Sequence, residues 1–153
     1  MFRGVNAINI DAKGRMVMPT RYRERLKEDN DDKMIITIDT DEHCLLIYPL
    51  HIWENIENKL AQLPSFNKAA RRIQRLLIGH ATEADLDSNG RMLVAPLLRE
   101  YAGLTKQAVL IGQGKKFELW DDTHWQEKRG QWLAEEAGAE ESDLPDEVKS
   151  LSL

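Results

Sequence analysis

Short apolar runs, separated by glycine, proline and acidic residues, occur along this chain in two similar series. Runs of this length that are rich in Ile, Leu, Val and aromatic residues and end at turn residues are typical of strands. We expect strands at residues 5–10, 15–18, 34–38 and 45–48 in the first series and at 82–86, 92–95, 109–111 and 117–120 in the second. The pattern therefore predicts two copies of one small unit made mainly of strands.

Helical spacing of apolar residues follows the strands. Pro19 and Pro96 each open a short helix, because the missing N–H of proline costs nothing in a first helical turn. We expect helices at 19–26, between Pro49 and Pro64, and at 67–77, 96–102 and 125–137. Proline stands eight residues after Asp11 but nine after Asp87, so the two short helices are expected to begin one residue apart.

The most specific feature of the chain is a motif that occurs twice. Asp11-Ala-Lys-Gly-Arg15 returns as Asp87-Ser-Asn-Gly-Arg91 seventy-six residues later, and six of sixteen aligned positions around it are identical. Aspartate at the first position of a type I turn accepts hydrogen bonds from nearby amides, and glycine at the fourth tolerates a positive φ. Two equivalent turns are therefore predicted, each formed and oriented by its aspartate and glycine: Asp11, Gly14, Asp87 and Gly90.

The turn geometry leaves the repeated arginine unexplained. An arginine four residues after an aspartate can form an ion pair with it, but an exposed pair contributes only about 0–1 kcal/mol. A more specific interpretation is that each turn holds a guanidinium rigidly, ready for a phosphate or a guanine edge. Arg15 and Arg91 are the candidates, and Lys13 adds a second cation to the first turn only.

The charge distribution matters more than the net charge of −5. Residues 1–27, which include Arg3, hold seven Lys or Arg against two acidic residues, whereas residues 138–153 hold five acidic residues against one lysine. A phosphate partner responds to local positive charge. A nucleic acid is such a partner, so we expect Arg3 to contact DNA together with the residues of the turns. We expect the acidic tail to be a solvated, partly disordered extension.

A second basic cluster lies on the helix expected at residues 67–77. Arg71, Arg72 and Arg75 cover much of one face of that helix. The simplest interpretation is a solvated face, and the alternatives are salt bridges between subunits or contact with the DNA backbone.

Composition excludes several other classes of protein. At 153 residues and 42% hydrophobic content the chain can bury one compact core. No run approaches eighteen apolar residues, and no signal-like stretch opens the chain, so we expect no membrane association. A single cysteine, Cys44, excludes an internal disulfide and fits the reducing cytoplasm.

Catalytic and metal sites find little support. Paired aspartates from two similar halves can share a proton, as in aspartic proteases, but Asp11 lacks a following small hydroxyl residue and Arg15 would keep it ionised. The four histidines and Cys44 lack the spacing of zinc ligands, and no glycine-rich phosphate loop is present. We expect no catalytic residue, no metal, no cofactor and no small-molecule substrate.

Taken together, several motifs resemble the bacterial MraZ family and cover the chain from Met1 to about Trp132. They are Phe2-Arg-Gly4, Asp11-x-x-Gly-Arg15 with Pro19, Cys44-Leu-Leu-Ile-Tyr-Pro49, Arg75-Leu-Leu-Ile-Gly-His80, Asp87-x-x-Gly-Arg91 and Lys116-Phe-Glu-Leu-Trp120. The resemblance implies an α+β fold, in which two SpoVT-AbrB-type pseudo-repeats of β-β-α-β-β form one small double-psi-like β-barrel with flanking helices. The expected segments are a first repeat at 5–52, a helical connector at 53–80, a second repeat at 81–124, and a helix with acidic tail at 125–153.

The resemblance also implies a function. Members of the family form ring-shaped oligomers and regulate the division and cell-wall gene cluster, so double-stranded DNA and further copies of the chain are the expected partners. Carried over by motif, Arg15 and Arg91 contact DNA, and Asp11 and Asp87 orient them. Lys13 matches a basic position, which Asn89 replaces in the second turn. The alternative is a scaffold ring whose basic loops dock an acidic protein.

Overall fold

The computed structural model describes residues 1–29 and 31–153. The run of Asp and Asn at residues 29–32 predicts a loop, and Asn30 within it lies outside the described residues. The chain divides into two compact units, Met1–Asp122 and Thr123–Leu153, which are considered separately. The first unit contains β1 (Phe2–Asn9), β2 (Arg15–Val17), α1 (Thr20–Glu28), β3 (Lys33–Ile38), β4 (Leu45–Pro49), α2 (Leu50–Ala61), α3 (Lys68–His80), β5 (Thr82–Asp85), β6 (Arg91–Leu93), α4 (Pro96–Tyr101), β7 (Gln107–Gly114) and β8 (Lys116–Asp121).

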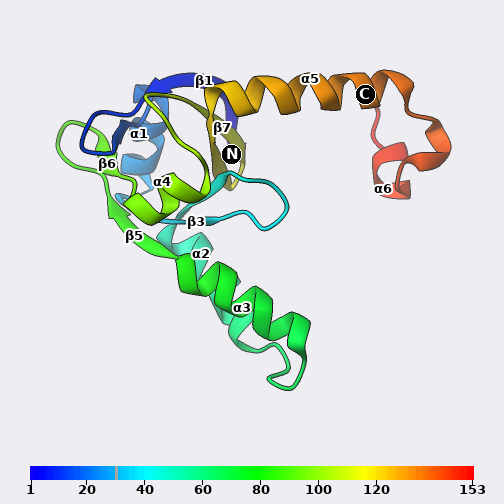
Figure 1. The fold of residues 1–153 in the computed structure, drawn as a ribbon, viewed down its shortest axis with the longest axis horizontal. Coiled ribbons are helices and arrows are strands. Elements are labelled where there is room, and N and C mark those ends of the chain that lie inside the picture. The colour runs from blue at the N-terminus through cyan, green and yellow to red at the C-terminus, as the bar shows by residue number, and fades with distance from the viewer. Residues whose placement is uncertain (30) are drawn as a thin grey trace. The chain divides into compact units, whose positions relative to one another are not determined.

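The strands of the first unit form two antiparallel arrangements (Figure 1). A six-stranded sheet has the order β1-β7-β8-β4-β3-β5, and β2 pairs with β6 in a separate two-stranded ribbon. The fold is therefore mixed, with helices and a mainly antiparallel sheet, and it accommodates two repeats. Among the described residues no pairing joins β1 to β5, so the sheet does not close and the expected double-psi-like barrel is not confirmed.

The two copies are interleaved. The hairpins β3–β4 and β7–β8 each lie within one copy. The other four strand pairings, β1–β7, β2–β6, β3–β5 and β4–β8, each join a strand of the first copy to a strand of the second. A single copy would leave two of its four strands unpaired, and backbone groups without partners are costly when buried. The two copies therefore form one unit.

The main core draws on equivalent positions of both copies. Met16 and Met92 are buried at the same place in the two motifs, and Tyr22 of α1 corresponds to the buried Leu98 of α4. Phe117 completes this core, stacking on Phe2 with 4.3 Å between the ring centroids. The short helices thus cover the same interior from two sides.

The short helices begin at equivalent residues, which corrects the stagger expected from the sequence. α1 starts at Thr20, nine residues after Asp11, and α4 starts at Pro96, nine residues after Asp87. Only the proline is displaced. Pro19 occupies the N-cap of α1, whereas Pro96 is the first residue of α4. Proline tolerates both places because neither requires its N–H.

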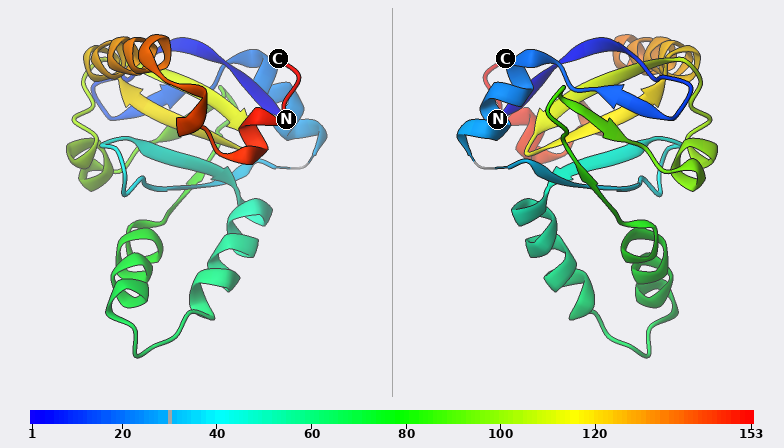
Figure 2. Two further views of the ribbon diagram at one scale, coloured as in Figure 1. Left: turned by 90° about the vertical axis from the view of Figure 1, so that its right-hand side faces the viewer. Right: turned by 90° about the vertical axis from the view of Figure 1, so that its left-hand side faces the viewer.

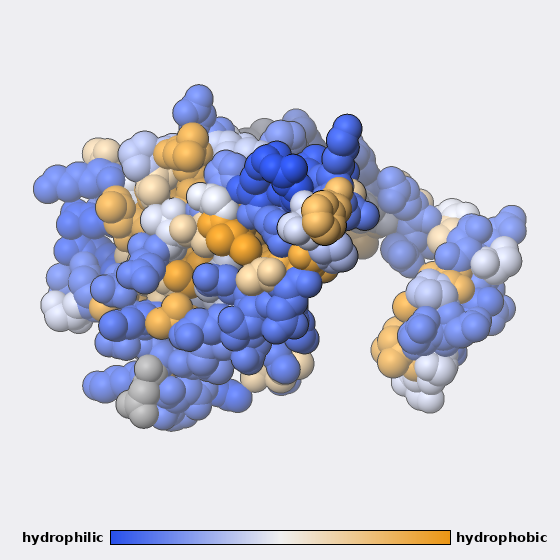
Figure 3. Space-filling view, turned by 90° about the horizontal axis from the view of Figure 1, so that it is seen from below, coloured by the Kyte–Doolittle hydropathy of each residue, from blue (hydrophilic) through white to orange (hydrophobic). Residues whose placement is uncertain are grey.

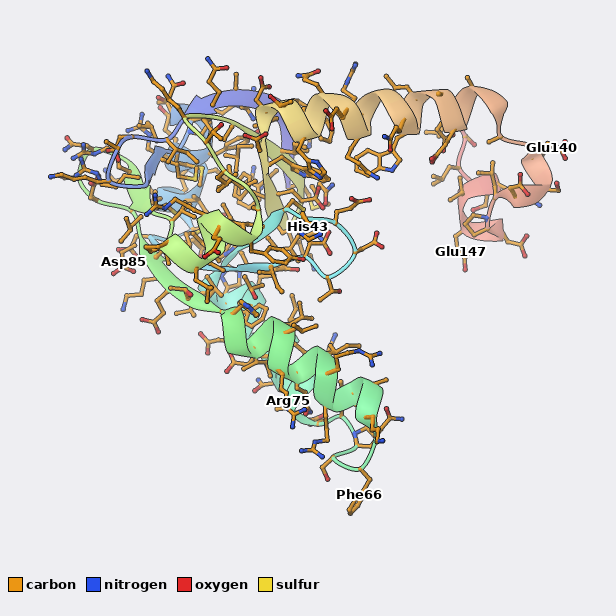
Figure 4. All side chains as sticks on the ribbon, in the orientation of Figure 1. His43, Phe66, Arg75, Asp85, Glu140 and Glu147 are labelled. Carbon is orange, nitrogen blue, oxygen red and sulfur yellow. The ribbon has the colours of Figure 1, made fainter. Side chains whose placement is uncertain are left out.

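Helices α2 and α3 form an arm that projects from the sheet, and the two views of Figure 2 show them side by side. A second core cluster, which includes Trp53, joins the arm to β3 and β4. The buried hydroxyl of Thr37 donates to the carbonyl of Leu77 at 2.7 Å. Phe66 lies at the tip with 98% of its surface exposed and points away from the arm (Figure 4). The face seen in Figure 3 is mostly hydrophilic, with separate apolar areas.

The second unit is mostly helical. It contains the greater part of α5 (Asp122–Gly138), a 3₁₀ turn at Glu141–Asp143 and α6 (Asp146–Lys149). The tail was expected to be solvated and partly disordered. Its residues from Gly138 onward are largely exposed, but the structure gives them these two short helical segments. In the described part of the chain, no helix combines the length and the apolar character that crossing a membrane would need.

Candidate functional site

The two Asp-x-x-Gly-Arg motifs form nearly identical turns. The Gly14 N–H donates to the Asp11 carbonyl at 2.9 Å, and the Gly90 N–H donates to the Asp87 carbonyl at 3.0 Å. Each aspartate Oδ1 also accepts two backbone N–H groups at 2.9 Å, from the second and fourth residues after it. Gly14 and Gly90 have φ of 87° and 72°. The turns predicted from the aspartates and glycines are therefore present.

Each aspartate also contacts the arginine of its own motif. Arg15 Nε donates to Asp11 Oδ2 at 2.8 Å, whereas Arg91 Nε lies 3.4 Å from Asp87 Oδ2, which is long for a hydrogen bond. The backbone N–H of each arginine lowers the pKa of its aspartate most, and the guanidinium lowers it further. Both aspartates are therefore ionised at neutral pH, as ion-pair partners must be.

The arginines keep their outer ends available. Both side chains are 31% exposed, and each meets its aspartate through Nε. No other described residue forms a hydrogen bond with the two terminal guanidinium nitrogens of Arg15 or Arg91. A guanidinium held through Nε can offer both terminal nitrogens to a planar acceptor.

The turns are joined across the copies by the β2–β6 ribbon. Met16 lies opposite Met92, and both side chains are buried. Beyond the ribbon, the Met18 N–H donates to the Gly90 carbonyl and the Val94 N–H donates to the Gly14 carbonyl, each at 2.9 Å. The two turns thus adjoin opposite ends of the short antiparallel ribbon, and Figure 1 shows both on the same side of the first unit.

Two further arginines complete this arrangement, Arg23 of α1 and Arg99 of α4. A Cβ added at Gly14 would lie 2.6 Å from Arg99 Cζ, and one added at Gly90 would lie 2.7 Å from Arg23 Cζ. Each short helix therefore places its arginine against the turn of the other copy. The sequence contained the signal, since Arg23-Glu24 recurs as Arg99-Glu100 at the motif's own offset, but sequence reasoning gave it no role.

Those arginines are held by backbone carbonyls. Arg99 Nε donates to the Val94 carbonyl at 3.0 Å, and Arg23 Nη1 donates to the Asn89 carbonyl at 3.2 Å. The Arg23 contact crosses between copies and links α1 to the second turn directly. We call Arg23 and Arg99 the clamp arginines.

The remaining predicted contact residues are distributed unevenly. Lys13 is exposed in the first turn, and Asn89 occupies the same place in the second. Arg3 is exposed near the start of β1, opposite Gln113. Asp11 stands eight positions after Arg3, and at ~3.3 Å per residue this corresponds to roughly 26 Å of extended strand. The structure therefore brings Arg15, Lys13 and Arg91 into one region and leaves Arg3 at the far end of β1.

The fold brings together one cluster of side chains of metal-binding types that the residue spacing did not indicate. Asp39, Cys44 and Glu118 place one ligand atom each within 4.8 Å of one another, and in the described part of the chain they are the only group of three that does so. The Cys44 thiol donates to Asp39 Oδ2 at 3.6 Å. Burial strongly raises the pKa of this thiol and also raises the pKa of Glu118. A metal binds thiolate, so a thiol held in its protonated form favours a hydrogen-bonded cluster instead.

Comparison with known proteins places the chain in a family. The family model described as "MraZ protein, putative antitoxin-like" matches residues 1–76 and matches again at 77–144. The chain belongs to the MraZ family. Proteins named transcriptional regulator MraZ from Coxiella burnetii, Legionella pneumophila and Halorhodospira halophila are 58%, 56% and 54% identical to it, over 153 residues that cover all of both chains.

Family membership confirms the resemblance drawn from the motifs. The two matches meet within α3, so each includes one Asp-x-x-Gly-Arg turn and one clamp arginine. The MraZ model thus recognises the same duplication that the strand pairings show.

Replacing Gly14 with alanine is expected to lower the free energy of unfolding more than replacing Gly103. Both glycines have positive φ, 87° and 60°, so each alanine costs about 1–2 kcal/mol of backbone strain. Only the alanine at 14 also meets Arg99, since an added Cβ at Gly103 has nothing within 4 Å. Urea denaturation of both variants measures the difference.

The same pair of substitutions in an Arg99→Ala background is the control. Removing the clamp guanidinium should bring the Gly14→Ala loss down to the Gly103→Ala loss. Equal losses in the original background, or an excess that persists without Arg99, would contradict the close packing of the clamp on the turn.

Proposed function

We propose that this protein is a sequence-specific DNA-binding regulator of transcription and that its two turns contact the DNA. The observation that carries the proposal is the state of the two arginines. Nε of Arg15 is hydrogen-bonded to its ionised aspartate and Nε of Arg91 forms a longer ion pair with its own, and no other described residue forms a hydrogen bond with the terminal nitrogens of either side chain. That geometry suits bidentate contact with the O6 and N7 atoms of guanine or with a phosphate. The names of the MraZ relatives support a role in transcription.

The first turn is the stronger candidate. It has Lys13 in addition to its arginine, and its ion pair is the shorter of the two, 2.8 Å against 3.4 Å. A shorter charge-assisted hydrogen bond fixes the guanidinium more firmly, so less conformational freedom is lost on binding. Arg3 joins the proposal only as a distant contact, since it lies at the far end of β1.

The finer parts of the proposal rest on the family resemblance. We propose that the DNA target is the promoter of the division and cell-wall gene cluster, which includes this protein's own gene, and that the protein is cytoplasmic and nucleoid-associated. We also propose that it binds repeated boxes as a ring-like oligomer. The segment boundaries at 5–52, 53–80, 81–124 and 125–153 and the AbrB-type nature of the two halves belong to the same proposal.

Arg15→Ala is expected to weaken DNA binding more than Arg91→Ala. Removing one phosphate contact lowers the slope of log affinity against log salt by about one unit, and the first turn contributes the denser positive charge. The measurement is a titration of DNA from upstream of this protein's own gene, at several salt concentrations, by fluorescence anisotropy.

Arg25→Ala serves as the charge-matched control. Arg25 is exposed and forms an ion pair with Asp29 four residues on, but it lies on α1 and outside the turns. It should change affinity little, and all three variants should keep the melting temperature and oligomer size of the parent. Equal losses at Arg15 and Arg91 would mean that the turns act symmetrically. Unfolding of Arg15→Ala would show that the arginine is structural, and salt-insensitive binding would favour the scaffold alternative.

The proposed assembly can be tested separately. One chain presents two turns and carries a net charge of −5, so tight binding requires several chains whose weak contacts reinforce one another by effective concentration. Light scattering should therefore give a homo-oligomer, and DNA with several boxes should bind far more tightly than DNA with one. A monomer that binds a single box equally well would contradict this.

A further inference from the structure

The outward face of the β2–β6 ribbon combines charge with exposed apolar surface. Side chains alternate across each strand, so Met16 and Met92 point inward and their neighbours point outward. The outward set consists of Arg15 and Val17 on β2 and of Arg91 and Leu93 on β6. Val17 is 45% exposed and Leu93 is 52% exposed. Packing in the core therefore does not account for an apolar residue at either position.

The register pairs each arginine with an apolar residue. Arg15 lies directly opposite Leu93, and Val17 lies directly opposite Arg91. Val17 and Leu93 occupy the same place in the two copies, seventy-six residues apart. The face therefore presents the pair of an arginine and an apolar side chain twice, in opposite directions.

An arginine that contacts only phosphate gains nothing from an apolar neighbour. Base edges are different, because the floor of the major groove shows both the guanine acceptors and the thymine methyl group, which apolar side chains contact. The major groove also admits a two-stranded ribbon. Opposed side chains in a ribbon have their Cβ atoms about 4.5–5.5 Å apart, and base pairs are stacked about 3.4 Å apart. Each pair thus spans neighbouring base pairs.

We propose that this ribbon face enters the major groove and that Val17 and Leu93 determine specificity by contacting thymine methyl groups beside the guanines that Arg15 and Arg91 contact. This inference rests on the proposed function and specifies which bases the proposed DNA-binding site recognises. Because the two pairs run in opposite directions, the sequence read by one chain has an inverted repeat of guanine and thymine preferences.

Replacing thymine with uracil in the DNA removes only the methyl group and leaves the hydrogen-bonding edge intact. The parent protein should bind the uracil form of its own upstream DNA about fourfold more weakly for each methyl group that Val17 or Leu93 touches. The double variant Val17→Ala with Leu93→Ala should bind the thymine and uracil forms equally. Its salt slope should match that of the parent, because apolar contacts neutralise no phosphate.

Val5→Ala is the matched control, since Val5 is 60% exposed but lies on β1, outside the ribbon. It should keep the full preference for thymine. A double variant that retains this preference, or one that loses oligomer size instead, would overturn the proposal and make the face structural or a contact between copies. If Arg15→Ala abolishes binding while the parent is indifferent to uracil, the proposed function stands and this inference fails. If the parent does not bind the DNA at all, the proposed function fails first.

Discussion

Two backbone hydrogen bonds between the copies hold the site together. Met18 donates to Gly90 and Val94 donates to Gly14, so each turn is fixed by the strand that leaves the other. A Cβ at either glycine would displace the clamp arginine that lies against it. Each turn therefore depends on the other copy in two ways: a backbone N–H of that copy binds the carbonyl of its glycine, and a clamp arginine of that copy packs against it.

This arrangement restricts the motion of the strands that carry Arg15 and Arg91, the two arginines proposed to contact DNA. An isolated hairpin is marginally stable in water, and a flexible loop loses conformational freedom when it binds. Here the ribbon rests on the buried Met16 and Met92, which belong to the main core. Packing of these two methionines in the core thus orients the strands that carry Arg15 and Arg91 before any partner binds. The six-stranded sheet, in which most pairings join the copies, extends the same dependence through the first unit.

The sequence predicted local features well and their combination less well. Both turns, the positions of the strands and the arm helices followed from Asp and Gly signals and from apolar spacing, because these depend on neighbouring residues. The clamp arginines recur in the sequence at the motif's own offset, but their packing against the opposite turn depends on contacts between distant segments. The Asp39–Cys44–Glu118 cluster depends on such contacts too, and no local pattern shows either arrangement. The closed barrel was inferred from family resemblance, and strand order is a property that residue spacing does not encode.

The two turns are expected to open as one cooperative unit, and native-state hydrogen exchange at the Met18 and Val94 amides measures this. Both residues are fully buried, and each donates across the copies. An amide that opens only with the whole unit exchanges with the free energy of global unfolding. If the turns open only together with the core, both amides exchange at this same free energy, as does the core amide of Leu110. Exchange of one amide through a low-energy local opening while the other stays protected would contradict it.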